Sequence, residues 1–470
     1  MLKNFLLFFT TTFVLAVSGC MDSANDAVWR DPPPLEQELS TFQSSEKPPA
    51  TFSETYEIAE PNGVLTRREA LALTLMNNPE LKVFSLETRA AEARELQAGL
   101  WPNPALEIGV DDVGGPGVRS GFGAAETTIQ LSQLIELGNK AQKRRKVASL
   151  EKELTGWDYQ AKRLEVLTEA SKAYIELLAI QEKAKLLAEL VDVSEQTVRI
   201  VTQRVDAGKD SPLEKTKASV ALSGVQLEHK QALQEMEAAR RIVASFWGNE
   251  QPKFMRVEGQ LETVTDIPEI NDLQQKLIQN PQLARWEKEI ARDKAALELA
   301  KSKALSDISI GAGVKRFNES DDNALVFGVT IPLPISDRNQ GGRMEAAYNL
   351  SKSYEEQRAA RIEVMNQFNQ IFTELSVSLN KIKELQASIL PGAREVFDAS
   401  REAYTQGKIG YLNVLDAQRT LFEVRGKYIE ALATHHKARA DVERLIGRSL
   451  ESLNGQTEAK NQLGANYHGE

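Results

Sequence analysis

Histidine side chains are the first groups in this sequence that could bind a metal ion or transfer protons, and there are four: His229, His435, His436 and His468. Two histidines spaced i, i+4 on a helix can face one ion, whereas adjacent residues lie about 100° apart around the axis. His435 and His436 therefore do not form a metal-binding pair. We expect four surface histidines and no metal site.

Catalytic motifs are missing from the rest of the sequence. There is no H-E-x-x-H and no G-x-S-x-G. The glycines between Gly114 and Gly123 fit neither phosphate-binding spacing, so they predict a loop that joins two strands. Abundant carboxylates are typical of solvated helix faces with i, i+4 partners. We expect no enzyme activity and no cofactor.

The net charge of -10 over 470 residues argues against a nucleic-acid partner, because proteins that bind nucleic acids usually carry a positively charged surface. The basic cluster Lys140–Lys146 is the local exception. We interpret it as a solvated helix start that needs no ligand.

The N-terminus predicts export and a lipid anchor. An apolar run from Phe5 to Val17 is too short to span a bilayer and is typical of a signal peptide, here residues 1–19. Its end, Val-Ser-Gly-Cys, resembles a bacterial lipobox, which implies that the sole cysteine, Cys20, is the lipid anchor. The alternative is an ordinary signal peptide with an incidental cysteine. Met21 follows in place of the Asp that retains lipoproteins at the inner membrane, which favours the outer membrane.

The chain then reads as an extended arm followed by two copies of one plan. Residues 20–65 are rich in proline and predict the arm. Asn78-Pro79 and Asn280-Pro281 open matching stretches at an offset of 202, and later stretches match at an offset of 199. We expect one repeat over 66–250, a second over 251–447 and a polar tail over 448–470. Each repeat predicts a helix, two strands, a very long helix, a tight turn and a returning helix.

Four segments alternate apolar and polar residues over about nine positions: Ala105–Asp112, Thr128–Leu134, Asp307–Lys315 and Leu325–Leu333. This pattern suits the strands of a transmembrane β-barrel. Four strands in an open sheet cannot span a membrane, because every backbone group must be paired in hydrocarbon. Several chains must therefore close the barrel, and two, three or four chains satisfy this requirement equally well.

The longest expected helix runs without proline from Lys140 to Ala207 and would reach about 100 Å. Its counterpart, Gly342–Gln406, contains Pro391, where we expect a kink. Helices of about 35 residues should return from each turn, and further helices of that length should begin near residues 66 and 270.

The duplicated Asn-Pro-x-Leu helix, the paired strands, the long helices and the sequence Gly407–Ala417 together resemble the TolC-type outer membrane efflux family. The resemblance covers about residues 65–447. The stretches Gly99–Pro104 and Pro332–Asn339 also resemble the cobalt-zinc-cadmium resistance branch of that family.

This resemblance implies a mainly α-helical homotrimer that shares a 12-stranded transmembrane β-barrel and a periplasmic α-barrel. Its partners would be outer membrane lipids, a periplasmic adaptor (membrane fusion) protein and an inner-membrane resistance-nodulation-division pump. The chain would conduct substrates passively, with heavy-metal cations and drugs as the two candidate cargoes. A non-conducting, lipid-anchored periplasmic scaffold remains the alternative.

The resemblance also implies a gate at the helical turns. Family motifs match Glu214 in the first repeat and Asn413 and Asp416 in the second, where an acidic ring would narrow the periplasmic aperture. Many members have Asp in place of Asn413, so one acidic tier is expected to be missing. The alternative is that these carboxylates are ordinary exposed helix residues. The tips expected to contact the adaptor are Gly208, Lys209, Gly407 and Lys408.

Overall fold

The computed structural model describes residues 60–277 and 280–450. The expected signal peptide, the Cys20 anchor and most of the expected arm lie outside the described residues, as do His468 and the tail from residue 451 onward.

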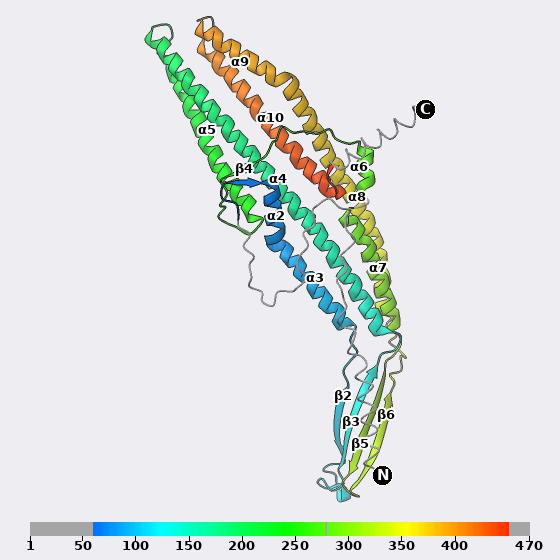
Figure 1. Ribbon diagram of the computed structural model, residues 1–470. Helices are drawn as coiled ribbons and strands as arrows, with labels where there is room; N and C mark the ends of the chain where they lie inside the picture. The colour runs from blue at the N-terminus through cyan, green and yellow to red at the C-terminus, as the bar shows by residue number, and fades with distance from the viewer. Residues whose placement is uncertain (1–59, 278–279, 451–470) are drawn as a thin grey trace, which may run out of the picture. The chain divides into compact units, whose positions relative to one another are not determined.

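Both repeats follow the expected order of helix, two strands, long helix, turn and returning helix (Figure 1). The first contains β1 (Val64–Thr66), α2 (Arg67–Asn77), α3 (Pro79–Ala98), β2 (Ala105–Asp111), the short helix η2 (Gly117–Arg119), β3 (Glu126–Ile135), α4 (Lys140–Asp206) and α5 (Pro212–Ser245). The second contains β4 (Arg256–Glu258), α6 (Ile270–Lys276), α7 (Pro281–Ser302), β5 (Ile308–Phe317), β6 (Asp322–Thr330), α8 (Gln340–Glu384), the π-helix η4 (Leu385–Ile389), α9 (Leu390–Thr405) and α10 (Tyr411–Ile446).

The duplicated Asn-Pro pair is a helix break, so the expectation of uninterrupted helices from residues 66 and 270 is wrong. Proline has no backbone N–H and fits the first position of a new helix. The Asn78 side chain caps α3 by accepting a hydrogen bond from Leu81 N at 3.0 Å, and it donates to Phe246 O at 2.8 Å. Each break therefore also fastens the helix to the end of a returning helix.

The second repeat uses the same device. The Asn280 side chain accepts from Gln282 N at 2.7 Å and donates to Leu445 O at 2.8 Å. Asn78 and Asn280 are both buried. Buried backbone groups need hydrogen-bond partners, so the backbone groups beside these two positions need a polar side chain there.

The four expected strands form one antiparallel sheet in the order β2-β3-β5-β6. Their positions confirm the pattern, and the largest difference is in β6, which begins at Asp322 instead of the expected Leu325. Strand β6 also ends at Thr330, before the expected Leu333. Pro332 explains the earlier end, because it cannot donate a hydrogen bond to a neighbouring strand.

The long helices also match, and the irregularity expected near Pro391 is present as the π-helix η4. Without an N–H, Pro391 cannot make the regular bond to the carbonyl four residues earlier, within η4. The equivalent part of the first repeat is uninterrupted helix in α4.

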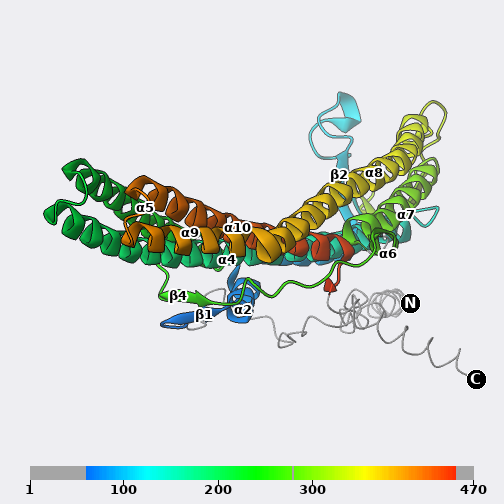
Figure 2. The ribbon, with the colours of Figure 1, turned by 90° about the horizontal axis from the view of Figure 1, so that it is seen from above.

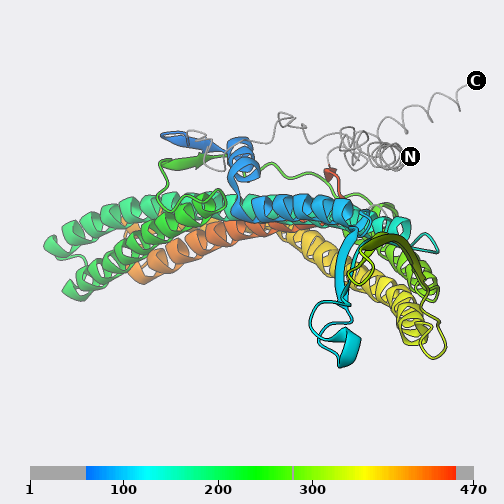
Figure 3. The same cartoon turned by 90° about the horizontal axis from the view of Figure 1, so that it is seen from below.

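Helix α4 connects the parts of the described chain. It packs against α3 and α7 over its first half and against α5 and α10 farther along (Figure 1). Figures 2 and 3 show the helices from above and from below. Because its first residue follows β3 and its last precedes a turn, the sheet and the two helical turns are separated by the full length of α4.

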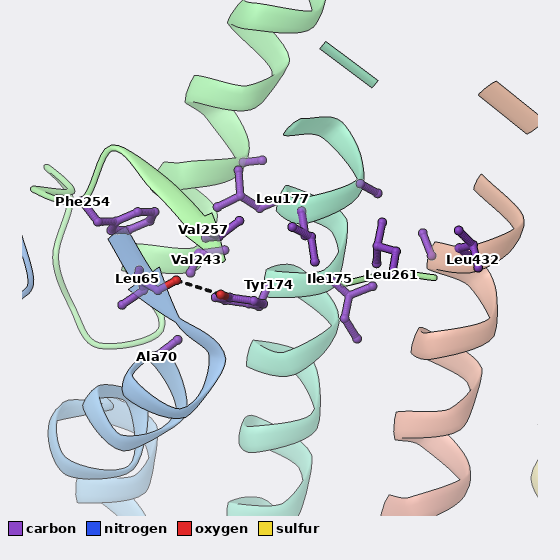
Figure 4. Close-up of a cluster of buried hydrophobic side chains, with 14 of the residues drawn as sticks. Leu65, Ala70, Tyr174, Ile175, Leu177, Val243, Phe254, Val257, Leu261 and Leu432 are labelled. Atoms are coloured by element: carbon purple, nitrogen blue, oxygen red, sulfur yellow. Dashed lines mark hydrogen bonds between the residues drawn. The ribbon is translucent and has the colours of Figure 1, made fainter. Parts of the chain in front are cut away.

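A small parallel sheet of β1 and β4 was not expected from the sequence. These strands have three residues each, too short for alternation to show. The Tyr174 hydroxyl joins them, with 2.8 Å to Leu65 O and 2.6 Å to Glu258 O, beside a cluster of buried apolar side chains (Figure 4).

The expectation of surface histidines is wrong for the adjacent pair in α10. His435 is 1% exposed, and its Nδ1 lies 3.4 Å from Ser378 Oγ in α8. The Nε2 of His436, which is half-buried, lies 2.8 Å from Leu261 O. Both side chains are on faces of α10 that pack against neighbouring segments. The angle of about 100° between adjacent helical residues gives their relative direction but not whether either is buried.

The expectation of a solvated helix start is wrong for Lys140, although Arg145 and Lys146 of the same cluster are exposed as expected. Lys140 is buried, and its Nζ donates to Leu305 O and to Asp307 Oδ1, each at 2.6 Å. Arg144 forms an ion pair with Glu136. This cluster ties the start of α4 to the segment before β5 and so joins the two repeats where helices meet strands.

Within residues 60–277 and 280–450, no helix is both long enough and apolar enough to cross a membrane. The same part of the chain contains no group of three or more His, Cys, Asp or Glu side chains placed to hold a metal ion.

Candidate functional site: the strand faces and the helical tips

The sheet of β2, β3, β5 and β6 has one apolar face that continues across all four strands. The register places Ile108 opposite Ile129, Ile129 opposite Val314, and Val314 opposite Leu325. The exposed members of this apolar face, between 39% and 70% accessible, are Leu106, Ile108, Val110, Ile129, Leu131, Ile310, Val314, Leu325, Phe327 and Val329. A surface of this size and composition is typical of a face that contacts lipid or another chain.

The opposite face is polar and rich in glycine. It carries Glu107, Thr128, Gln130 and Ser132 on the first two strands, and Ser309 with several glycines on the others. Transmembrane β-strands show the same alternation, with apolar side chains toward lipid and polar side chains toward the lumen.

The two outer strands each leave one edge without a partner among the described residues. Strand β2 pairs with β3 alone, and β6 pairs with β5 alone. Open edges are unstable in a membrane and readily pair with another chain.

The turns at the far end of the long helices have the same geometry in both repeats. Gly208 (φ +69°) and Gly407 (φ +76°) adopt the left-handed conformation that glycine tolerates best. Lys209 N donates to Arg204 O and Lys408 N to Ala403 O, at 2.8 and 2.9 Å, which closes each helix end. All four residues expected to contact an adaptor are exposed at these turns.

An ion pair and a tyrosine connect the two turns. Arg204 Nε donates to Asp210 Oδ2 at 2.8 Å and Arg204 Nη2 to Asp210 Oδ1 at 3.2 Å. From the other repeat, the Tyr404 hydroxyl donates to Asp210 Oδ2 at 2.7 Å, and the Arg204 guanidinium lies 4.7 Å from the centre of the Tyr404 ring. We call these three residues the tip link.

The tip link holds Asp210 ionised. The Arg204 guanidinium, and next the Tyr404 hydroxyl, lower the pKa of the Asp210 carboxyl below its usual value of 3.8. Burial and the neighbouring carboxylate raise the pKa of the Tyr404 hydroxyl, so it remains a donor at physiological pH. The link is therefore charged and intact near neutral pH.

Glu214 lies in the first turn of α5 and is half-buried. Its Oε1 is 3.8 Å from Lys217 Nζ, and its Oε2 is buried with no hydrogen-bond partner among the described atoms. The buried hydroxyl of Tyr411 has a raised pKa, caused mainly by burial, with a smaller contribution from the Glu214 charge. Glu214 therefore faces protein and a lysine more than open solvent.

Asn413 and Asp416 share the exposed side of α10, three residues apart. The Asn413 side chain donates to Gly410 O at 3.4 Å, whereas the Asp416 carboxylate has no ion pair within the described chain. At the offset of 199 between repeats, Asn413 corresponds to Glu214 and Asp416 to Lys217. The structure thus brings Asn413 and Asp416 together on one face, and it records no contact between them and Glu214.

Sequence reasoning missed the contacts among Arg204, Asp210 and Tyr404. The sequence did offer a signal. Asp210 directly follows the Gly208-Lys209 turn, Arg204 lies four residues before Gly208, and Tyr404 lies three residues before the equivalent Gly407.

The fold is that of outer-membrane channels. The chain resembles a membrane protein from Pseudomonas aeruginosa with a TM-score of 0.71 and 18% identity, covering 82% of this chain and 90% of that one. It resembles the Campylobacter jejuni CmeC outer membrane channel with a TM-score of 0.69 and 15% identity, covering 84% and 89%. At these identities the likeness concerns the fold alone.

The model of the outer membrane efflux protein family matches residues 70–249 and 273–448, and the chain belongs to that family. A relative from Cupriavidus metallidurans, the cobalt-zinc-cadmium resistance protein CzcC, is 32% identical over 389 residues, 83% of this chain and 91% of that protein. These findings confirm the expected family, the expected similarity to its cobalt-zinc-cadmium resistance branch, and an outer-membrane location.

Proposed function

We propose that this chain is the outer-membrane exit duct of a three-part efflux system. Three chains would close their sheets into one barrel of 12 strands, with the apolar face toward lipid and the polar face toward the lumen. The observation that carries the proposal is the apolar face, which stays in register across four strands and ends at two open edges.

The helices supply the periplasmic part of the duct. At about 1.5 Å per residue, the 67 residues of α4 reach about 100 Å from the sheet. Lys209 and Lys408 stand exposed at the far turns, where a periplasmic adaptor would contact them. An inner-membrane resistance-nodulation-division pump would supply the energy, so the duct itself conducts passively.

Heavy-metal cations are the proposed cargo. The name of the Cupriavidus metallidurans relative, a cobalt-zinc-cadmium resistance protein, supports this choice. Three-fold symmetry would bring three Asp416 carboxylates together at the aperture, and a ring of like charges in a narrow pore attracts cations. Glu214 contributes less to that ring, because Lys217 lies beside it.

The Cys20 lipid anchor remains a prediction, since it lies outside the described residues. A closed barrel holds itself in the membrane, and the acyl chains would add to that attachment.

Substitutions on the two sheet faces test the facing of the strands. Ile310→Arg places a charge on the apolar face and should cost about 2–4 kcal/mol near the membrane centre. Ser309→Arg, one residue earlier on the polar face, should assemble far better. Equal yields of membrane-inserted, heat-resistant oligomer from the two variants would contradict the assigned facing.

Conduction separates the duct from a non-conducting scaffold. Purified oligomer added to a planar bilayer should give discrete single-channel currents. A lipid-anchored scaffold would remain membrane-associated and give none.

A further inference from the structure

The middle of the polar face contains one charged residue, Glu107. The register places Glu107, Gln130, Gly313 and Val326 in one row across β2, β3, β5 and β6. The carboxylate is exposed and has no ion pair within the described chain. By contrast, the Lys315 ammonium, nearer the loop ends of the strands, forms an ion pair with Glu126.

Gln130, the neighbour of Glu107 on β3, is folded away from it. An ideal Cβ built on Gly311 would overlap Gln130 Nε2 and lie 3.0 Å from Gln130 Cδ, and one built on Gly328 would lie 3.5 Å from Gln130 Nε2. The amide therefore extends over β5 toward β6, in the space that the missing side chains of Gly311 and Gly328 leave open.

This placement matters because directly opposed residues of an antiparallel pair have Cβ atoms about 5 Å apart. At that separation a glutamine amide can donate a hydrogen bond to a glutamate carboxylate. Folded over Gly311, Gln130 leaves the Glu107 carboxylate uncovered on the polar face.

We propose that Glu107 gives the strand-lined segment of the duct its preference for cations, and that Gln130, folded over Gly311, keeps this carboxylate exposed to permeating ions. The inference rests on the proposed function, because it requires the polar face to line a lumen. Three chains would place three Glu107 carboxylates at one level, far from the Asp416 aperture.

The glycines provide a matched pair of variants. Gly311→Ala adds a methyl group that meets the flexible end of Gln130, so the amide must leave this space and can then donate to the Glu107 carboxylate opposite it. Gly109→Ala adds the same methyl group on the same face of β2, where no atom lies within 4 Å. Substitution of Gly313 is unsuitable, because its Cβ would meet the backbone of β3.

The test is the reversal potential of single channels in a potassium chloride gradient. Glu107→Gln should lower the ratio of potassium to chloride permeability by about twofold or more, and Glu107→Asp should retain it. Gly311→Ala should lower the ratio and the conductance, and Gly109→Ala should leave both at the wild-type values.

The Glu107 substitution should be repeated in an Asp416→Ala chain, so that the charge at the other end of the duct cannot mask its effect. An unchanged reversal potential for Glu107→Gln in both chains overturns the proposal, as does an identical effect of the two alanine variants. Wild-type protein that forms no channels would instead overturn the proposed function itself.

Discussion

The strength of the tip link determines how firmly the two helical turns of one chain are held together. Tyr404→Phe keeps the aromatic ring beside Arg204 and removes the hydroxyl that donates to Asp210 Oδ2 at 2.7 Å. A hydrogen bond to a charged group contributes about 1.5–3 kcal/mol. The Arg204 and Asp210 side chains are only 17% and 14% exposed, so water replaces the lost bond poorly.

We take about 2 kcal/mol for this bond, which corresponds to a change of about 30-fold in the equilibrium between joined and separated turns. If the joined turns narrow the aperture, single-channel recordings of Tyr404→Phe should show a strongly increased open probability. Tyr411→Phe is the control, because its ring lies 6.3 Å from that of Tyr404 and it removes a hydroxyl outside the tip link. An open probability equal to wild type in both variants would refute the reasoning.

The pH dependence of the tip link follows from the lowered pKa of Asp210. A carboxyl whose pKa is lowered by folding contributes its full stability at pH values above the usual pKa of 3.8. That contribution is lost only as the pH falls through the lower pKa of the folded state. Open probability should therefore not rise between pH 7 and pH 5 because of this group. A steep rise in wild type that Asp210→Asn abolishes would contradict the assigned pKa direction.

The other predictions concern the aperture, a buried histidine and the anchor. Asp416→Ala should raise single-channel conductance and weaken block by divalent cations, with Asn413→Ala adding less; unchanged values in the double variant would place the constriction elsewhere. Burial lowers the pKa of His435 to about 4, so its contribution to stability is full above pH 6.5 and declines by up to about 3 kcal/mol as pH falls toward 4. The decrease in melting temperature between pH 7.5 and pH 5 should be smaller in His435→Gln, and an equal decrease would contradict the buried neutral ring. Cys20→Ala should abolish acyl labelling while much of the protein stays in the membrane, and persistent labelling would rule out the lipobox.

The repeat made most of the fold predictable. Periodicity of two identified the four strands and periodicity of 3.6 identified α4, because both patterns persist over many residues. The short strands β1 and β4 have three residues each and carry no such pattern. The helix breaks at Asn78 and Asn280 were misinterpreted because alanine, glutamate and leucine continue on both sides of the proline, although the Asn-Pro pair itself signals a cap.

The site was predictable only in part. A family motif led us to propose Glu214, Asn413 and Asp416 as aperture residues, but a motif does not reveal that Lys217 lies beside Glu214. The tip link joins Asp210 and Tyr404 across 194 positions, and no local pattern reports such a contact. The burial of Lys140 and His435 likewise depends on segments that are distant in the sequence.

Cross-linking of the open sheet edges tests the central claim, that three chains close one barrel, most directly. In a Cys20→Ala chain, one cysteine would replace Ile108 on β2 and another would replace Phe327 on β6, both on the apolar face. A short bifunctional maleimide applied to membranes should give covalent dimers and trimers and nothing larger, while each single-cysteine chain should stay mostly monomeric. Products that stop at the monomer, or continue past the trimer, would contradict a barrel closed by three chains.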